Sequence, residues 1–317
     1  MIPELANTSP AFKLQLLLKE RARMLAHVRA FFAQREVVEV DCPALTKNAP
    51  VDEHTDVMSV SVASGEKRYL HTSPEYGMKR LLAAGCGDIY QMSHVFREGE
   101  SGHLHNPEFM LVEWYRLGMP FEHFIEETLN FLRLFLQDLP AQCQSYRELL
   151  KAHTGIDYLK ANKEDLLEVL NSRQIKLSSE WDFDGLLQLI LSTFIEPSLG
   201  EHSLFVITDF PASQAALSQV KNGVAERFEV YHKGIELANG YHELADAEEQ
   251  RKRFIDANAK RIRNGKNPLP IDDYLIDALA QGFPDCCGVA AGFDRLFMLM
   301  QKEKTVEAVL PFSWNNA

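Results

Sequence analysis

The sequence predicts a globular protein of the α+β class in which strands pair antiparallel. Two strand-like stretches, 89–96 and 108–116, are separated by a polar loop that contains glycine, as expected for an antiparallel pair. A second pair, 224–231 and 235–238, flanks the turn His-Lys-Gly and predicts a hairpin. Apolar side chains at helical spacing over 20–36 add an amphipathic helix.

Composition and charge exclude several classes of protein. The chain has 317 residues, 46% of them apolar and 25% charged, which is ordinary for a soluble globular protein. A net charge of −12 disfavours indiscriminate binding to nucleic acid or anionic lipid. No apolar run approaches the roughly 18 residues of a membrane span, and no secretory signal begins the chain, so we expect a cytoplasmic location. Without repeats or linkers, we expect one domain over 1–317, with a loose end at 1–12 and a helical elaboration at 121–200.

Several common site types are absent from the sequence. The 5 cysteines are odd in number and lack C-x-x-C spacing, so reduced structural thiols are expected rather than disulfides or a zinc ribbon. The phosphate-loop, G-x-S-x-G and complete G-x-G-x-x-G patterns are missing. His242-Glu243 opens an H-E-x-x-H pattern, but Asp246 stands where the second histidine belongs.

Local signals give the first elements of the chain. The helix over 20–36 is followed by a strand over 37–40, which Pro43 stops. The run Thr-Ser-Pro-Glu at 72–75 predicts a helix start, with a capping residue, a proline in the first turn and a glutamate three positions after the threonine. That helix stops at Gly85.

Later elements follow in the same way. Residues 204–207 form a buried-strand candidate, and 246–262 a charged helix that ends near Gly265. The glycine-containing stretch 288–292 leads into a helix that begins near Phe293.

Alternation along 108–115 places two sets of side chains on opposite faces of a strand. The apolar set, which suits a core, is Met110, Val112 and Trp114. The mixed set is Phe109, Leu111, Glu113 and Tyr115. A ring, a carboxylate and a phenol on one face suit the lining of a ligand cleft. The alternative is a sheet edge with one face in water.

Charged residues supply candidate ligand contacts. Arg97, at the end of a strand, could bind a phosphate with its planar fork of donors, or lie solvated in its loop. Glu229 and Glu236 lie on the two arms of the hairpin, where facing carboxylates could hold Mg²⁺ or both lie in water. Glu243 could turn into the same cleft and receive an ammonium group.

Arg295 is a local anomaly in the first turn of the helix that begins near Phe293. The helix dipole disfavours a cation there. A glycine-rich approach, a helix N-terminus and an arginine together suit a polyphosphate. The alternative is an exposed arginine beside Asp294.

The order of these features resembles the class II aminoacyl-tRNA synthetases. Their first motif corresponds to the helix and 38–43, the second to 96–97, 105–109 and 113–115, and the third to 288–295. Residues 72–75 and 235–244 resemble the lysyl branch of that family. The similarity runs from about residue 20 to about residue 315. It implies a class II catalytic domain, an antiparallel sheet flanked by helices, and a homodimer formed largely through the first motif.

Departures from true lysyl-tRNA synthetases indicate a specialised branch. Ser73 stands where those enzymes have alanine, and Ala290 stands in place of the second glycine of the third motif. Gln91 stands where those enzymes have a glutamate that binds the α-amino group of lysine. Such changes near the amino end of the substrate fit a β-amino acid. Gly99 stands where the family usually has glutamate, and His94 replaces a usual arginine. We expect no anticodon-binding domain in front of this core.

The resemblance also implies roles for individual residues. ATP would contact Arg97, Glu98, Gly99, His105, Asn106, Phe109, Glu236, Leu237, Gly292 and Arg295. The amino acid would contact Ser73, Pro74, Glu75, Gln91, Tyr115, Asn239, Glu243 and Ala290. The two catalytic arginines, Arg97 and Arg295, would hold the α- and γ-phosphates, and Glu229 and Glu236 would carry Mg²⁺.

The implied reaction activates β-lysine with ATP as the adenylate and transfers it to a lysine of elongation factor P, with no tRNA involved. One alternative is a synthetase or free amino-acid ligase that uses L-lysine. Another is a regulatory paralogue without activity, which the presence of the arginines and glutamates for phosphate and metal disfavours.

Overall fold

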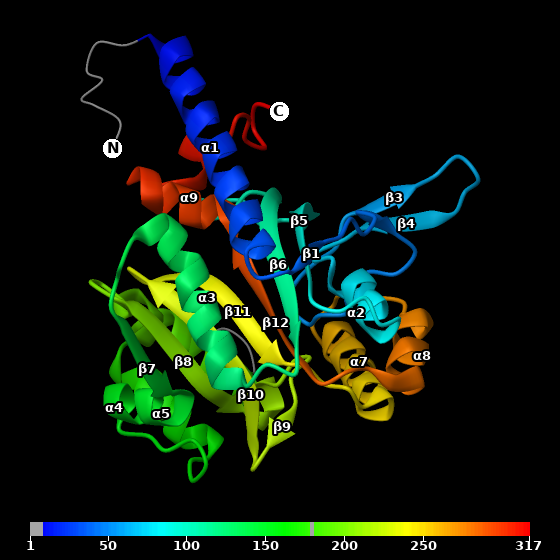
Figure 1. Cartoon of the computed structure of the whole chain (residues 1–317). Coiled ribbons are helices and arrows are strands. Elements are labelled where there is room, and N and C mark those ends of the chain that lie inside the picture. Colours follow the sequence, from blue (N-terminus) through cyan, green and yellow to red (C-terminus); the bar gives the residue numbers. More distant parts are fainter. Residues whose placement is uncertain (1–8, 178–180) are drawn as a thin grey trace. The chain divides into compact units, whose positions relative to one another are not determined.

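A computed structural model describes residues 9–177 and 181–317 (Figure 1). Contacts within the chain divide it into two compact units. Unit 1 comprises Met1–Gln137 and Leu244–Ala317, and unit 2 comprises Asp138–Glu243. Each unit has its own set of paired strands and its own helices. The single domain expected from the sequence stays a prediction.

Unit 1 combines an antiparallel-dominated sheet with helices. Its helices are α1 (Pro10–Ala33), α2 (Glu75–Ala83), α3 (Phe121–Leu136), α7 (Ala247–Arg263), α8 (Asp273–Gly282), α9 (Phe293–Gln301) and the 3-10 turn η4 (Val306–Val309). Its strands are β1 (Val38–Glu39), β2 (Leu45–Thr46), β3 (Ser59–Ser61), β4 (Lys67–Leu70), β5 (Ile89–Phe96), β6 (Glu108–Leu117) and β12 (Cys286–Gly292).

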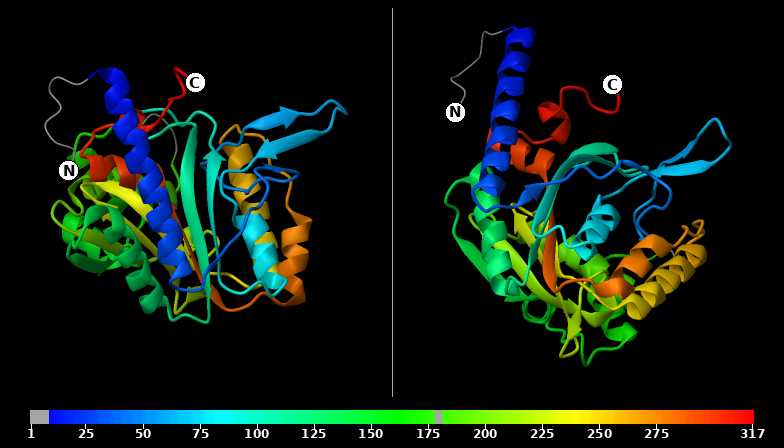
Figure 2. Two further views of the ribbon diagram at one scale, coloured as in Figure 1. Left: turned by 45° about the horizontal axis from the view of Figure 1, so that its top comes forward. Right: turned by 45° about the vertical axis from the view of Figure 1, so that its right-hand side comes forward.

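The main sheet of unit 1 has the order β1-β5-β6-β12. β1 runs parallel to β5, whereas β5, β6 and β12 pair antiparallel. The antiparallel pair expected from the sequence is therefore confirmed. A small antiparallel sheet, β2-β4-β3, carries a hairpin that extends away from the main sheet in each view (Figures 1 and 2).

Two helix starts differ from the expectation. α1 begins at Pro10, ten residues before the expected start, because the Ser9 side chain accepts a hydrogen bond from the Phe12 amide and proline suits the first turn. Of the loose end expected at 1–12, residues 1–8 lie outside the described residues and the rest cap or begin the helix. α2 begins at Glu75, whose amide donates to Ser73 Oγ, so Thr72 is not its cap.

An aromatic core covers one face of the β5–β6 pair. Phe32 of α1 stacks on Tyr90 with ring centres 4.1 Å apart and meets Trp114 edge-on at 5.4 Å. Phe131 of α3 lies 4.8 Å from the Trp114 ring. Trp114 is buried, as its expected core face requires, whereas Met110 near the strand start is only half-buried. The mixed face of β6 therefore points away from this core.

Unit 2 holds a second set of strands. They are β7 (Ala141–Ser145), β8 (Leu204–Pro211), β9 (Val220–Lys221), β10 (Val224–His232) and β11 (Ile235–His242). Its helical segments are α4 (Tyr146–Thr154), α5 (Lys163–Ser172), α6 (Phe183–Ile190), the π-helix η1 (Leu191–Ile195) and the 3-10 turns η2 (Glu196–Ser198) and η3 (Ala212–Gln214). The elaboration expected at 121–200 is thus mostly helical, but it contains β7 and begins with α3 of unit 1.

The strands of unit 2 follow the order β11-β10-β8-β7, with β9 paired to β10. β7 runs parallel to β8, and the other pairs are antiparallel. The hairpin β10–β11 confirms the expected one, and both Lys233 and Gly234 in its turn have positive φ, as a tight hairpin turn requires. Buried side chains from α4, α5, α6 and β8 form the core.

A bulge in this hairpin brings two carboxylates to one face. Glu229 pairs with Asn239, but Tyr231 pairs with Glu236, so Leu237 is an extra residue in β11. A regular ladder would pair Tyr231 with Leu237 and turn Glu236 to the opposite face. The bulge instead places Glu236 on the face that carries Glu229. The two carboxylates are not directly opposite each other, which corrects the facing arrangement expected from the sequence.

Two further features of the described residues concern the cysteines and the hydropathy of the helices. All 5 cysteines are free thiols, and Cys42, Cys286 and Cys287 among them are buried. No helix in 9–177 or 181–317 has the length and apolar character needed to cross a membrane.

Candidate active site

A row of three neighbouring residues crosses the sheet of unit 1. Glu113 of β6 pairs with Gln91 of β5 on one side and with Ala290 of β12 on the other. One step along, Leu111 pairs with Gly292. Paired residues share a face, so Glu113 is flanked on the β12 side by small residues.

Glu113 is a buried carboxylate with two hydroxyl donors. Only 3% of it is exposed. Ser73 Oγ donates to Oε2 and the Tyr115 hydroxyl donates to Oε1, both at 2.6 Å. Burial, followed by the negative charge of Glu75, raises the pKa of Glu113 to about 7. The mixed face of β6 is therefore neither in water nor apolar, and its carboxylate suits an amino group.

The side chain of Gln91 is engaged by the backbone. Its Oε1 accepts from the Cys42 amide at 2.7 Å, and its Nε2 donates to the Cys42 carbonyl at 3.2 Å. The buried amide thus ties β5 to the end of the segment that resembles the first motif. Gln91 lies beside Glu113, but both of its polar ends have protein partners, so its contact with an amino acid stays a prediction.

Two arginines converge beside the loop between β5 and β6. The Arg97 guanidinium carbon lies 5.1 Å from the centre of the Phe109 ring, and its Nη1 is 3.7 Å from Glu100. Within the described residues, the buried Nε of Arg97 has no hydrogen-bond partner. Arg295 donates from Nε to the Leu104 carbonyl at 3.1 Å.

His105 joins the two arginines. Its Nε2 lies 2.7 Å from Nη2 of Arg295. Desolvation, then the positive charge of Arg295, lowers the pKa of His105; the negative charge of Glu100 opposes this shift, and the weaker effect of Arg97 adds to it. Both guanidinium groups therefore act on one imidazole, which stays neutral and accepts a hydrogen bond at neutral pH. Two cations around a neutral ring suit an anionic polyphosphate.

The aspartate that precedes Arg295 does not neutralise it. Asp294 is buried, where it accepts from Arg21 at 2.6 Å and from the Met110 amide at 2.7 Å. The alternative of an exposed arginine beside Asp294 is therefore wrong. Arg295 lies in the first turn of α9, as expected, and the glycine-containing stretch that precedes it is strand β12.

Loop residues with predicted ATP contacts have structural partners. Asn106 donates to the Glu108 carbonyl at 2.6 Å and accepts from the Trp314 amide at 2.9 Å, so it joins the loop to the C-terminal segment. The Glu98 amide donates to the Asp56 carbonyl at 2.9 Å. Gly99 has φ of 78°, a conformation that favours glycine over the glutamate usual in the resembling family.

Unit 2 gathers carboxylates around one arginine. Glu229 is buried, forms an ion pair with Arg227, and accepts from the Tyr231 hydroxyl at 2.6 Å and from Asn239 Nδ2 at 3.3 Å. Burial, then the charges of Glu229 and Glu236, raises the pKa of Glu196 to about 7. The sequence analysis missed Glu196 because no motif surrounds it; its charge interacts with those of Glu229 and Glu236.

Carboxylates this close to one another suit a divalent cation. Among the described residues, no group of three or more His, Cys, Asp or Glu side chains forms a metal cage. Mg²⁺ commonly takes only one or two protein carboxylates and completes its shell with phosphate oxygens and water. Glu229 and Glu236, on one face of the hairpin, match that need.

Two further predicted residues lie near the end of β11. Leu237, the bulge residue, is buried. Glu243 directly follows β11 and is also buried, and its carbonyl accepts from Gln219 Nε2 at 3.0 Å. Of the predicted residues, the structure brings Ser73, Gln91, Tyr115 and Ala290 beside Glu113, His105 beside Arg295 and Phe109 beside Arg97 in unit 1, and Asn239 beside Glu229 in unit 2.

Gly292 tests the nucleotide end of the site without disturbing the fold. A Cβ added there would lie in ordinary contact with Arg295, 3.8 Å from its Cδ, and φ of Gly292 is −76°. We expect Gly292→Ala to keep the wild-type melting temperature but to raise KM for ATP several-fold, since the added methyl group would lie beside Arg295, the arginine predicted to bind phosphate. Thermal unfolding and ATP-dependence of pyrophosphate exchange check this; an unchanged KM would contradict a nucleotide at Gly292.

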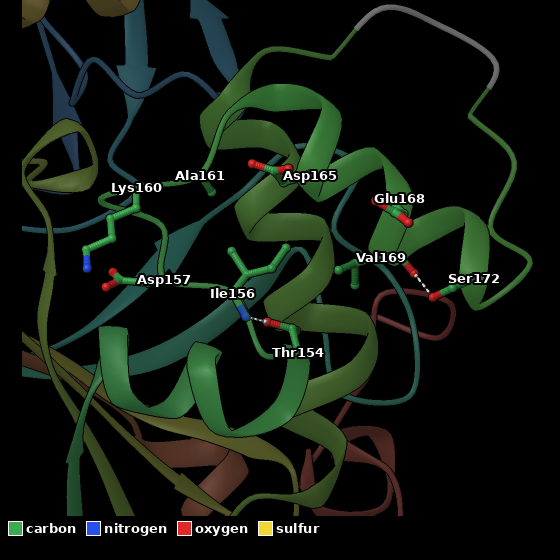
Figure 3. A pocket seen from close by; sticks show the side chains of 9 residues that line it. All are labelled: Thr154, Ile156, Asp157, Lys160, Ala161, Asp165, Glu168, Val169 and Ser172. Carbon is green, nitrogen blue, oxygen red and sulfur yellow. Dashed lines mark hydrogen bonds between the residues drawn. The ribbon is translucent and has the colours of Figure 1, made fainter.

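A separate pocket in unit 2 contains none of these residues. It has a volume of about 480 Å³ and lies between the loop that follows α4 and helix α5 (Figure 3). Asp165 at its rim accepts from the Asn162 amide at 2.8 Å and so caps α5. Asp157 pairs with Arg147 at 2.5 Å. These two aspartates therefore serve the local fold.

Comparison with known proteins agrees with this geometry. The family model of class II tRNA synthetases (D, K and N) matches residues 9–316. A Salmonella gallinarum protein named elongation factor P–(R)-β-lysine ligase is 44% identical over 99% of both chains. A Photobacterium profundum protein of the same name is 46% identical over 93% of this chain and 94% of its own. Three ordered motifs, an α+β fold with antiparallel sheets, and matches over nearly the whole length agree: this chain belongs to the class II tRNA synthetase family of the D, K and N type.

Proposed function

We propose that this protein is an ATP-dependent ligase that activates (R)-β-lysine as its adenylate and transfers it to a lysine side chain of elongation factor P. The two relatives compared above are named for that activity, and each aligns with this chain over almost its whole length. One observation carries the proposal: a single face of β6 presents Phe109, beside Arg97, and then Glu113, with Ser73 and Tyr115 as its donors. A nucleotide end and an amine end thus share one strand.

In the first step, a carboxylate oxygen of β-lysine attacks the α-phosphorus of ATP, and the bond to the β-phosphate oxygen breaks to release pyrophosphate. Arg97 stabilises the charge that develops on the α-phosphate, and Arg295 binds the polyphosphate. Glu229 and Glu236 would hold Mg²⁺, which would supply positive charge to offset that of the phosphates. Glu113, held by Ser73 and Tyr115, binds the substrate's amino group near the reacting carboxylate, while Glu243 receives the ε-ammonium.

In the second step, the neutral amine of the acceptor lysine attacks the acyl carbon of the adenylate. An amide bond forms, AMP leaves with the bonding electrons, and the amine nitrogen loses a proton. Enzyme residues supply position and charge and form no covalent intermediate.

Substrate preference is proposed to depend on the amine end of the site. Moving the amino group by one carbon misplaces its hydrogen bonds, and a buried unpaired polar group costs about 1–3 kcal/mol. Ser73 touches Glu113, and Ala290 flanks it in the sheet. These contacts favour β-lysine over L-lysine, the substrate of the alternative function.

The working form is proposed to be a cytoplasmic homodimer. Exposed apolar side chains line α1, among them Phe12, Leu14 and Leu18, and this helix resembles the first motif, through which class II enzymes pair. The acidic net charge of −12 gives no basic platform for tRNA.

Intact-protein mass spectrometry tests the function. Unmodified elongation factor P is incubated with this enzyme, ATP and Mg²⁺, with (R)-β-lysine in one tube and L-lysine in another. We expect a mass gain of one lysyl unit, faster with β-lysine. A gain with L-lysine alone would overturn the substrate, and a gain in neither tube, while pyrophosphate exchange continues, would overturn the acceptor.

A further inference from the structure

Lys79 is a lysine buried beside the amine end of the site. It lies on α2, and only 1% of its side chain is exposed. Its Nζ forms an ion pair with Glu75 Oε1 at 2.7 Å, one helical turn away. Burial of an ammonium group is costly, even when it is paired. The next residue, Arg80, lies exposed on the same helix, so α2 has a solvent face that Lys79 does not use.

A chain of contacts connects Lys79 to Glu113. The carboxylate of Glu75 holds Lys79, and the amide of Glu75 donates to Ser73 Oγ at 3.0 Å. Ser73 Oγ in turn donates to Glu113. The charges also interact directly: the carboxylate of Glu75 raises the pKa of Glu113, and the ammonium of Lys79 lowers it.

The charges of this group do not cancel. Two carboxylates, Glu75 and Glu113, face one ammonium, Lys79. The side-chain donors to Glu113 are the neutral hydroxyl groups of Ser73 and Tyr115, and the nearby Cys42 thiol is also neutral, because burial raises its pKa to about 11. Fully ionised, the three side chains carry one excess negative charge. One added ammonium group neutralises them, whereas without Lys79 two would be required.

We propose that Lys79 is a positioning and specificity residue that holds Glu75 and sets the amine end of the site to accept one ammonium group. This inference rests on the proposed function, since the group it concerns is the one that binds the substrate's amino group. It explains why a lysine is retained in the interior. Lys79 acts through Glu75 and Glu113 and does not itself touch the reacting atoms.

A double-mutant cycle that removes the charges of Lys79 and Glu75 tests the role of Lys79. The measurement is β-lysine-dependent pyrophosphate exchange across the neutral pH range. In the wild type, KM for β-lysine falls as pH rises and Glu113 loses its proton. Lys79→Met removes a charge that lowers the pKa of Glu113, so we expect the fall in KM to move to higher pH and KM at neutral pH to rise about tenfold, with a smaller change in kcat.

The companion variants have opposite expectations. Glu75→Gln removes a charge that raises the pKa of Glu113, so its profile should move to lower pH. The double variant K79M/E75Q removes both charges, and its profile should return toward that of the wild type. Arg80→Met, which removes an exposed cation from the same helix, should leave the profile in place.

The outcomes separate the two hypotheses. A wild type without β-lysine-dependent exchange would overturn the proposed function. An active wild type, together with a K79M enzyme that has a lowered melting temperature but an unchanged KM and pH profile, would overturn the role of Lys79. If K79M does not fold, the double variant decides: a profile that coincides with that of E75Q would show that the charge of Lys79 does not act on Glu113.

Discussion

An Arg97→Ala enzyme is expected to form the adenylate about 10²- to 10³-fold more slowly than the wild type. Arg97 extends from the end of β5 beside Phe109, and within the described residues its buried Nε has no hydrogen-bond partner. Such a donor stabilises the transition state more than the ground state, because negative charge develops on the α-phosphate in the transition state. Pyrophosphate exchange should therefore show a fall in kcat with little change in KM for β-lysine.

Two further variants sharpen the Arg97 experiment. Arg97→Lys keeps the charge but loses the planar fork of donors, so it should recover only part of the rate. Arg251→Met removes an exposed arginine that pairs with Asp273 on the surface, and it should behave as wild type. A kcat for Arg97→Ala close to that of the wild type would rule out a role in the chemical step.

The fold of the nucleotide end was predictable because it depends on local patterns. β5 spans the residues expected, and β6 runs one residue beyond them, because alternating side chains and a polar loop are properties of the sequence itself. The same holds for the turn of the β10–β11 hairpin, where glycine follows lysine. Spacing alone also put Arg295 in the first turn of its helix.

The hairpin bulge could not be predicted in this way. Alternation along β11 would separate Glu236 from the face of Glu229, and only the register of the folded hairpin, with Leu237 unpaired, brings them together. No sequence signal marks the bulge. The hairpin predicted from the sequence placed the two carboxylates on neighbouring strands, but the register that puts both on one face was not predictable.

Burial was the other property that the sequence did not reveal. The face of β6 with Glu113 could equally have been wet, and Lys79 looks like an ordinary surface lysine of an amphipathic helix. The structure buries both, because α2 packs against α8 and Ser73 and Tyr115 close over the carboxylate. The polarity of a residue is read from its type, but its pKa depends on partners that are distant in sequence.

Glu113→Gln should raise KM for β-lysine about 10- to 100-fold at neutral pH, because a hydrogen bond to a charged group contributes roughly 1.5–3 kcal/mol. The variant should also lose the pH dependence of KM. In the wild type the pKa of Glu113 is about 7, so the carboxylate that binds an amine forms only as pH rises through neutrality. Glu108→Gln, an exposed change on the same strand, is the control.

The pH dependence of stability is expected to run opposite to that of substrate binding, because deprotonation of Glu113 favours binding but destabilises the folded protein. Burial raises the pKa of Glu113 from 4.5 to about 7 in the folded protein, so between these values the folded state binds more protons than the unfolded state. The contribution of Glu113 to stability is therefore full below pH 4.5 and is lost as pH rises toward 7. Melting temperatures across this range should show a decline in the wild type that Glu113→Gln reduces.

A variant that binds β-lysine poorly yet melts with the wild-type pH dependence would mean that Glu113 contacts the substrate without being the buried acid that titrates. A variant that loses both dependences together would tie substrate binding and the stability cost to one proton on Glu113.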